Sequence, residues 1–446
     1  MTPKTWRLRA WVLVGISWMF AARVQAQERR VSLDELLAHA EDHAPQLIEA
    51  RARLADGEAA RTGASPLLRD GLQVAVGIGP RLQEVQSAGP NDWDLQFTLT
   101  QPIEVASERG ARLDAADRLA EQRQRELEAV RWDVHRQIHL AYHQALQRRA
   151  RIAAADRWIE QASEVLRIAT SRSQVGEGAD IERVIAQAEL ARAQQQRLGA
   201  RSDFQTAVLL LAEVTGWDPS DPPVPAGELD APDMLPDDEA LVAIAMEHQP
   251  LIAAASAAAA TARADVVRED REAFPTLDLG ISVAREGAAG SPANWIALGW
   301  LGVTLPFWDQ NTQARAEASA AQTVAEAAET ALRSRLRARV LGFAAQVRLL
   351  AERLRTYQQE VMPGFDASVA GLTQAYQIGE IDLATLSAGR QTLLSMQIES
   401  LDAYTEYHAA LAELEMVLGA EIDLHESATP RSETAPSAPS SSGGDE

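Results

Sequence analysis

The sequence contains no cysteine among its 446 residues. Disulfide bonds are therefore excluded, and so is a lipid anchor attached to an N-terminal cysteine. Basic residues are outnumbered, with 42 lysines and arginines against 64 aspartates and glutamates, and the formal charge is −22. Nucleic acid is not expected as a partner, because a phosphate backbone repels an acidic protein. Self-repulsion and attraction for cations are the expected consequences.

Long hydrophobic runs are also scarce. The apolar stretch "AWVLVGISWMFAA" follows Lys4, Arg7 and Arg9, and it ends near the small residue Ala26. This is the pattern of a secretory signal peptide over 1–26, and a signal anchor is the alternative. The run is short for a spanning helix, which needs about 20 residues. No later run reaches that length, so the mature chain is predicted to have no transmembrane helix.

Enzyme motifs are missing. The sequence has no phosphate-binding loop, no H-E-x-x-H and no G-x-S-x-G, which are the signatures of nucleotide, metalloprotease and hydrolase sites. Pairs of acidic residues are abundant, but they lie on predicted helix faces, where they are usually solvated. The sequence therefore predicts no catalysis and no cofactor.

Proline is absent from Ile103 to Asp218, where apolar residues keep a heptad-like spacing. This predicts a helix of about seventy residues, a reversal at "SQVGEGAD" (173–180), and a second helix of about forty. Ser32 and Glu35 form a capping box that starts the first helix of the chain. A kink is expected at Pro363-Gly364 in the second half.

The chain contains a tandem duplication. "ELLAHAEDHAPQLIEA" (35–50) matches "ALVAIAMEHQPLIAAA" (240–255) at an offset of about 205 residues, and "LAEVTG" and "LEMVLG" end the two halves at Gly216 and Gly419. Each half is expected to contain a helix, two strands and two long helices. The predicted order after the signal peptide is a first repeat, a Pro/Asp-rich linker, a second repeat and a disordered tail: 27–217, 218–237, 238–424 and 425–446.

Four segments alternate apolar and polar residues with period two. They are 72–79, 93–100, 276–283 and 295–305, the last being apolar on both faces. Membrane-spanning strands have this period and about this length, although a half-buried sheet of a soluble protein shares the period. Trp93, Trp295 and Trp308 lie at the two ends of the strand pairs, as in an aromatic belt; packing in a core is the alternative.

Each half runs from a strand through a proline, Pro102 or Pro306, into a long helix. Four strands cannot close a barrel, and open sheet edges are not tolerated in lipid. A lone long helix likewise buries little surface. A ring of identical protomers satisfies both needs, with a β-barrel on an α-helical cylinder and the two prolines at the junction.

These features resemble the TolC family of outer-membrane channels over residues 32–424. The motifs "QPIEVASERGAR" and "TLPFWDQNTQAR" are similar to those of its CzcC-like heavy-metal efflux branch, with Trp308 and Gln313 departing from the usual residues. The resemblance implies a mainly α fold with a small β part, in which a homotrimer builds a twelve-stranded barrel in outer-membrane lipid of a Gram-negative bacterium. A helical tunnel would extend through the periplasm.

The resemblance also implies a passive exit duct for heavy-metal cations, supplied by an inner-membrane pump and a periplasmic membrane-fusion adaptor. A duct for drugs or secreted polypeptides is a second reading, and a soluble periplasmic coiled-coil scaffold is a third. In the family, the adaptor meets two helical reversals at the periplasmic tip. They correspond here to Val175, Gly176, Glu177, Ile378, Gly379 and Glu380.

The aspartates that constrict the TolC tunnel align with Thr385 and Ala388, so that gate is not carried over. Glu380 and Asp382 could replace it near Thr385, although a helix start also favours acids. His135, His139 and His143 form one stripe along the first long helix. Such i, i+4 pairs can chelate zinc or copper, and packing between helices is the alternative.

Overall fold

The structure is a computed structural model that describes residues 30–80, 93–174, 180–229, 231–232, 234–288 and 291–422. The predicted signal peptide, the first reversal at Val175, Gly176 and Glu177, and the predicted tail lie outside the described residues. The described chain is mainly helical, with one four-stranded sheet and one two-stranded ladder. The predicted fold class of the protomer is confirmed.

The two repeats have the same order of elements. The helices of the first are α2 (Leu33–His43), α3 (Pro45–Ala52), α4 (Leu54–Ala64), α5 (Glu108–Gln174) and α6 (Asp180–Thr215). Those of the second are α7 (Asp238–His248), α8 (Pro250–Glu272), α9 (Thr312–Thr356), α10 (Phe365–Gln377) and α11 (Leu383–Leu418). With 67 residues, α5 is about 100 Å long at 1.5 Å per residue.

Two features of these helices follow from local sequence signals. Ser32 and Glu35 form the predicted capping box at the start of α2, each side chain accepting from the other's backbone N–H. The predicted break at Pro363 is also confirmed. After α9, a π-helical turn (Tyr357–Val361) and a 3-10 turn (Met362–Gly364) precede α10, because proline cannot donate the helical hydrogen bond.

The chain divides into two compact units whose boundaries cut across both repeats. Unit 1 contains the described residues up to Pro45, Gln137–Pro232 and Leu350–Ala409. Unit 2 contains Gln46–Arg136, Asp233–Leu349 and the described residues from Ala410 onward. Each unit is described separately below.

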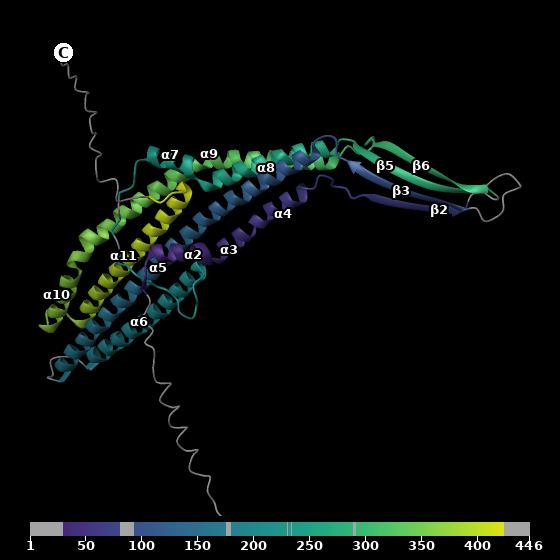
Figure 1. Cartoon of the computed structure of the whole chain (residues 1–446). Helices are drawn as coiled ribbons and strands as arrows, with labels where there is room; N and C mark the ends of the chain where they lie inside the picture. The colour runs from purple at the N-terminus through teal and green to yellow at the C-terminus, as the bar shows by residue number, and fades with distance from the viewer. Residues whose placement is uncertain are drawn as a thin grey trace, which may run out of the picture. The chain divides into compact units, whose positions relative to one another are not determined.

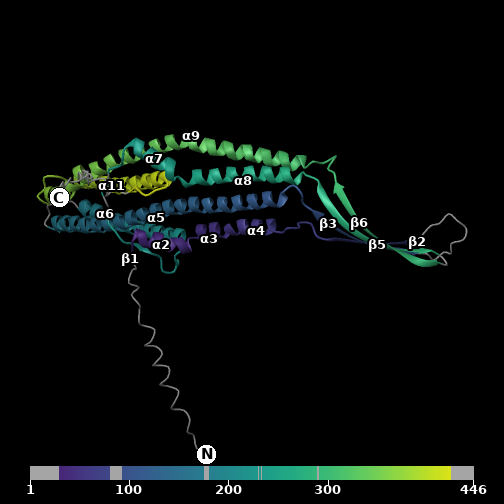
Figure 2. The ribbon, with the colours of Figure 1, turned by 45° about the horizontal axis from the view of Figure 1, so that its top comes forward.

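In unit 1, parts of α5 and α6 lie side by side (Figures 1 and 2). A buried cluster joins them to α10 and α11 and consists of Val165, Ile168, Ala169, Ala186, Tyr376, Leu383 and Leu386. The alanines let the helix backbones approach closely, and the larger side chains fill the space between them. The core of this unit is thus a contact between helices of the first and second repeats.

The Pro/Asp-rich linker is held against unit 1. Its strand β4 (Val224–Pro225) pairs in parallel with β1 (Arg30–Val31). Tyr142 donates a hydrogen bond to the carbonyl of Ala226, and Arg149 donates to the carbonyls of Pro225 and Gly227. These hydrogen bonds hold the linker against α5.

Unit 2 carries the sheet, with the strands β2 (Gln73–Pro80), β3 (Trp93–Ile103), β5 (Thr276–Ala288) and β6 (Ser291–Thr304). All neighbours are antiparallel, in the order β2-β3-β5-β6 (Figure 1). The four predicted strands are confirmed. The register places the apolar residues of β2, β3 and β5 in rows on one face, such as Val76, Phe97 and Val283.

The opposite face explains why β6 looked ambiguous in the sequence. There the rows contain small or polar residues of β2, β3 and β5, such as Ala75, Thr98 and Ser282, and end at Leu298 of β6. On the same face the Trp300 ring covers Gly280 so closely that a Cβ added to Gly280 would lie 2.0 Å from the ring. β6 is apolar on both faces because its second face packs this ring.

A glycine ends the last helix of each repeat, as the duplication predicted. Gly216 after α6 and Gly419 after α11 have φ angles of 70° and 69°, a region that strains other residues. Gly216 lies against the carbonyl oxygen of His43, and Gly419 lies against that of His248. The two repeats therefore use the same backbone contact, once in each unit.

Replacing Gly216 by alanine should destabilise unit 1 by about 2–4 kcal/mol. The new Cβ would lie 2.0 Å from the His43 carbonyl oxygen, and the positive φ adds strain. Thermal unfolding measures the change. Gly199 of α6 is the matched control, because a Cβ there meets nothing within 4 Å, and alanine should be neutral or slightly stabilising. Equal melting temperatures for both variants would contradict the contact.

Within the described part of the chain, one helical stretch, Asp238–Glu272, is long and apolar enough to cross a membrane by length and composition alone. The sequence analysis expected none after the signal peptide. The difference arises from the alanines of α8, which raise the mean hydropathy without a run of large side chains. The core helix of a soluble protein passes the same test, so the stretch by itself assigns no span.

Candidate functional site

The first junction between sheet and helix, in unit 2, is held by a buried ion pair. Arg112 of α5 donates to both carboxylate oxygens of Glu104, at 2.5 and 3.0 Å. Their side chains are only 8% and 18% exposed. Between them, Ser107 adopts a φ of 64° and its carbonyl accepts from the Ala111 N–H, which starts the helix. The motif "IEVASERGAR" is thus a folded connector.

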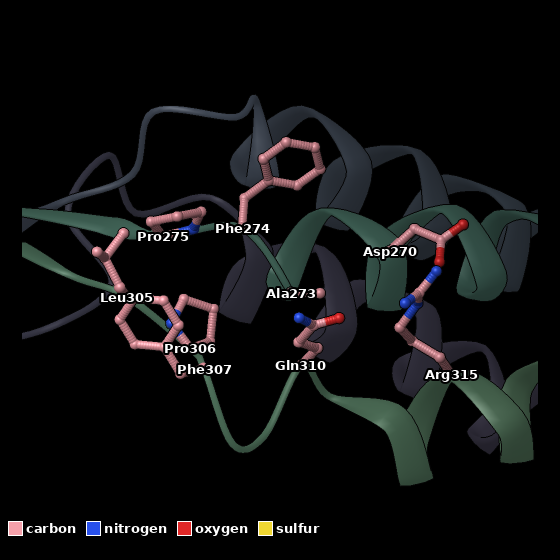
Figure 3. A pocket seen from close by; sticks show the side chains of 9 residues that line it. All are labelled: Asp270, Ala273, Phe274, Pro275, Leu305, Pro306, Phe307, Gln310 and Arg315. Atoms are coloured by element: carbon pink, nitrogen blue, oxygen red, sulfur yellow. The ribbon is translucent and has the colours of Figure 1, made fainter.

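The second junction repeats this geometry. Asn311 has a φ of 55°, and its carbonyl accepts from the Arg315 N–H at 3.0 Å. Its side-chain amide donates to the Glu269 carboxylate at 2.8 Å. The Arg315 guanidinium donates to Asp270 at 2.6 Å, and Figure 3 shows these two side chains pointing toward one another. Asn311 is the counterpart of Ser107 at the offset of 204 residues.

Pro102 and Pro306 lie at these junctions, on the strand side of each helix start. Pro102 is inside β3, where it pairs with Asp278, and α5 begins only at Glu108. Pro306 follows the end of β6, and α9 begins at Thr312. A short connector, and not the proline itself, therefore leads into each helix. A residue with positive φ turns the chain instead, and neither Ser107 nor Asn311 carried a turn signal as strong as glycine.

An open cavity of about 560 Å³ lies at the second junction. Its apolar wall consists of Phe274, Pro275, Leu305, Pro306 and Phe307 (Figure 3). Phe307 is 74% exposed, and the neighbouring Trp308 is 99% exposed. Large apolar side chains with this exposure mark a surface that meets lipid or another chain.

The tryptophans predicted for the aromatic belt are all exposed. Trp93 and Trp295 are 50% and 67% exposed near the outer ends of β3 and β6. Trp308 lies beyond the other end of β6. The nine steps along the strand from Trp295 to Thr304 span about 30 Å at 3.3 Å per residue, close to the apolar band of about 25 Å of a tilted membrane strand. The positions agree with a belt, which stays a prediction.

The two outer strands of the sheet are unpaired on one side in the described part of the chain. β2 is hydrogen-bonded only to β3, and β6 only to β5. Apolar side chains along both strands are largely exposed, including Val74 at 64%, Ile78 at 71% and Leu301 at 66%. Exposed backbone groups on an apolar strand are costly in lipid, so both edges need further strands.

The second predicted reversal, in unit 1, lies between α10 and α11. Gly379 has a φ of 81° and donates to the Tyr376 carbonyl at 3.1 Å. Glu380 donates to the Ala375 carbonyl at 2.9 Å. These two bonds make a Schellman motif, which requires the left-handed conformation at the glycine. Ile378 stays 62% exposed beside it, an apolar side chain that no neighbour of the described chain covers.

A side-chain latch lies directly beside this reversal. The Tyr376 hydroxyl donates to Glu182 of α6 at 3.1 Å, and Arg172 of α5 donates to the Tyr376 carbonyl at 2.9 Å. The Arg172 guanidinium also lies 5.1 Å from the centre of the Tyr376 ring. Burial, together with Glu182, raises the pKa of Tyr376 to about 12, so the hydroxyl stays a donor. Sequence reasoning missed this latch, because its residues are about two hundred positions apart.

The residues considered for a periplasmic gate also lie in unit 1. Asp382 caps α11 by accepting from the Thr385 N–H at 2.8 Å. Hydrogen bonds from the Thr385 side chain and backbone lower the pKa of Asp382. Asp382, Glu380 and Thr385 are all exposed. The helix-start alternative therefore accounts for Asp382, and a gate role for these residues stays a prediction.

The histidine stripe meets partners that the sequence did not indicate. In unit 2, His135 lies 3.9 Å from the Glu415 carboxylate and 3.7 Å from that of Glu421. In unit 1, the His143 ring stacks on His408 with centroids 3.7 Å apart. The sequence analysis considered only residues four positions apart on the same helix, whereas these partners lie near the other end of the chain.

A metal site at His135, His139 and His143 stays a prediction. The ring centroids of His139 and His143 are 6.1 Å apart. His143 bonds to the Tyr404 hydroxyl at 2.8 Å. Burial holds the pKa of His143 well below its usual value and lowers that of His408 to about 3. Neutral imidazoles of this kind can ligate a metal, but the stacked pair is also a packed core contact, the alternative of the sequence analysis.

Glu415 should make the stability of unit 2 depend on pH. Burial raises its pKa from 4.5 to about 7. Between these values the folded state binds more protons than the unfolded state, so stability falls as pH rises, by on the order of 3 kcal/mol. Burial lowers the pKa of His135 from 6.5 to about 4. Through this group, the stability of the folded state rises with pH between these two values.

Replacing Glu415 by glutamine removes the pH dependence of stability that comes from Glu415 and leaves the one that comes from His135. We expect unfolding measured from pH 5 to 8 to show a variant that gains stability relative to the native protein as pH rises toward 7 and keeps that gain above it. A constant difference between the two proteins over this range would show that Glu415 does not titrate there.

Comparisons with known proteins agree with this geometry. The model of the outer membrane efflux protein family matches residues 34–217 and 241–420, one match in each repeat. The cobalt-zinc-cadmium resistance protein CzcC of Cupriavidus metallidurans is 24% identical over 318 residues, 71% of this chain and 75% of that protein. The nickel-cobalt-cadmium resistance protein NccC of Alcaligenes xylosoxydans xylosoxydans is 24% identical over 314 residues, 70% and 68% of the two chains.

Among solved structures, the outer-membrane channel OprN superposes with a TM-score of 0.69 at 18% identity, covering 87% of this chain and 90% of that one. The likeness extends over both repeats and supports the fold described above. The family match covers far more than half of the chain. This chain therefore belongs to the outer membrane efflux protein family, and it is an outer-membrane channel protein whose helices extend into the periplasm.

Proposed function

We propose that this chain forms, as a homotrimer, the outer-membrane exit duct of a tripartite system that exports heavy-metal cations. The observation that carries the proposal is the sheet of unit 2. Its two edges are unpaired in the described residues, its apolar rows are exposed, and its strands β3 and β6 lead through short connectors into α5 and α9. A protein with such a sheet is completed by copies of itself.

The number of copies follows from the width that a duct needs. Two protomers would give eight strands, and the interior of an eight-stranded barrel is filled by its own side chains. Three protomers give twelve strands and leave room for a channel. In such a ring β6 of one protomer pairs with β2 of the next, which removes both edges. The resemblance to the TolC family implies the same number.

The substrate class rests on the two relatives named above, both of which are heavy-metal resistance proteins by name. The acidic composition supports a cationic substrate, because a protein with 64 acidic and 42 basic residues attracts cations. The chain itself would perform no chemistry. A pump in the inner membrane would supply the driving force, and the duct would provide a path through the periplasm and outer membrane.

The adaptor would meet the tip reversals. At the described one, exposed Ile378 flanks a rigid glycine turn, and an apolar side chain beside a helix end can seat a partner helix. Gly176 with Val175 and Glu177 would form the equivalent contact in the first repeat. Outer-membrane lipid would contact the apolar rows of the sheet and the exposed tryptophans.

Deleting the gene in its host tests the proposal. We expect increased sensitivity to cobalt, zinc, cadmium or nickel, restored by the native gene, with unchanged sensitivity to organic drugs. Outer-membrane extracts should contain the protein as a trimer. Lost drug tolerance with unchanged metal tolerance would show that the substrates are organic drugs and not metal cations. A soluble monomer in the periplasm would contradict the proposal that the protein is an outer-membrane duct.

A further inference from the structure

A fully buried arginine lies in the helical wall of unit 1. Arg390 of α11 is 2% exposed, the largest side chain among the most buried ones of the described chain. Its guanidinium lies 4.7 Å from the centre of the Trp158 ring of α5. One of its terminal nitrogens donates to the Gln161 side chain at 3.2 Å. The guanidinium therefore contacts the face of the Trp158 ring and the neutral amide of Gln161.

The charge of Arg390 is not neutralised by a direct contact. Among the described residues, no carboxylate lies within 4.0 Å of its guanidinium, and its buried Nε has no hydrogen-bond partner. Glu189 of α6 is the acid that acts on it electrostatically, but that carboxylate accepts a hydrogen bond from Ser387. A buried charge with so little compensation is strongly destabilising, and an arginine does not lose its proton to avoid the cost.

A small cavity lies beside Arg390. It has a volume of about 60 Å³ and is lined by Arg390, Trp158, Glu189, Ser387 and residues of the same three helices. Arg192, an exposed residue of α6, supplies a second guanidinium to its wall. Two cations and one anion therefore surround a space larger than the share of one water molecule, about 30 Å³. The local charge balance calls for one further negative charge.

We propose that this cavity binds a small monovalent anion, with chloride as the representative ligand, between Arg390 and Arg192. The anion would lie beside the Arg390 and Arg192 side chains and offset the net positive charge of the cavity wall. It would hold α11 against α5 and α6 close to the Gly379 reversal, eleven residues away along the chain. The site is independent of the proposed transport function.

Thermal unfolding of the detergent-extracted protein tests the proposal. Chloride is varied at constant ionic strength against gluconate, which is too large for the cavity. We expect a saturable rise of the melting temperature by about 2–4 °C. Crystals grown in bromide should show an anomalous peak in this cavity, between the Arg390 and Arg192 side chains.

Three variants locate the effect. Arg390→Met should abolish the chloride response. Arg192→Gln, an exposed position that leaves folding intact, should raise the half-saturating chloride concentration by about tenfold. Arg167→Gln is the control, because Arg167 is an exposed arginine of α5 already paired with Glu164 at 2.6 Å, and its response should equal that of the native protein.

The chloride titration and the bromide crystals of the native protein test the proposal even if Arg390→Met does not fold. A melting temperature independent of chloride, together with no bromide peak at Arg390, overturns the proposal. A chloride response that persists unchanged in Arg192→Gln and Arg390→Met places the anion elsewhere and also overturns it. Neither result bears on metal export.

Discussion

Replacing Glu104 by glutamine should destabilise the first junction of unit 2 by about 3–5 kcal/mol. The substitution keeps the size of the side chain but leaves the Arg112 charge buried without its carboxylate partner. The native pair is bidentate, at 2.5 and 3.0 Å, and both side chains are largely buried. The expected result is a large fall in melting temperature and in the amount of trimer recovered from outer membranes.

The chain offers a matched control on the same helix. Glu128 and Arg131 of α5 form an ion pair of similar length, 2.5 Å, but their side chains are 48% and 35% exposed. Glu128→Gln should change stability by less than about 0.5 kcal/mol. Changing Glu104 and Arg112 together to methionine should restore part of the loss, because no charge then stays buried. Equal effects of Glu104→Gln and Glu128→Gln would show that burial does not strengthen the junction pair.

Replacing Gly379 by valine should abolish export while leaving the trimer assembled. A β-branched residue at a φ of 81° is strained by about 1–3 kcal/mol, so the Schellman motif should open and move Ile378 and the start of α11. The core of the unit is built from other residues, and the strand pairing lies in unit 2. The measurement is metal tolerance of the complemented deletion strain beside the trimer content of its membranes.

Gly371→Val is the control for this variant. Gly371 lies within α10, has no positive φ, and a Cβ there meets nothing within 4 Å. Valine at that position should be neutral or slightly stabilising, because valine has a better helix propensity than glycine, and export should continue. Normal metal tolerance in Gly379→Val would show that the reversal is not the contact through which the duct works.

Much of this protein follows from local patterns in the sequence. The alternation of Leu72, Val74, Val76 and Ile78 gave a strand, and the proline-free stretch after Ile103 gave a helix within a few residues of its observed length. Such patterns are reliable because they reflect hydrogen bonding within a helix and the two faces of a sheet. The duplication placed Gly216 and Gly419 at equivalent ends, and both have positive φ.

The function-bearing motifs could be found in the sequence but not explained by it. "QPIEVASERGAR" pointed to the family, yet nothing in its spacing shows that Glu104 and Arg112 meet in a buried pair. The positive φ of Ser107 was invisible for a similar reason. Serine adopts many conformations, and the surrounding contacts choose this one.

The sequence by itself determined the strands, the long helices, the repeat and the reversal at Gly379, because each depends on residues within a few positions of one another. Only the tertiary structure decided which side chains are buried together: Glu415 beside His135, Glu182 at the Tyr376 hydroxyl, and Arg390 on Trp158 without a carboxylate partner. These contacts join residues roughly 190 to 280 positions apart. Their energies depend on burial, which is a property of the packed helices and not of any local pattern.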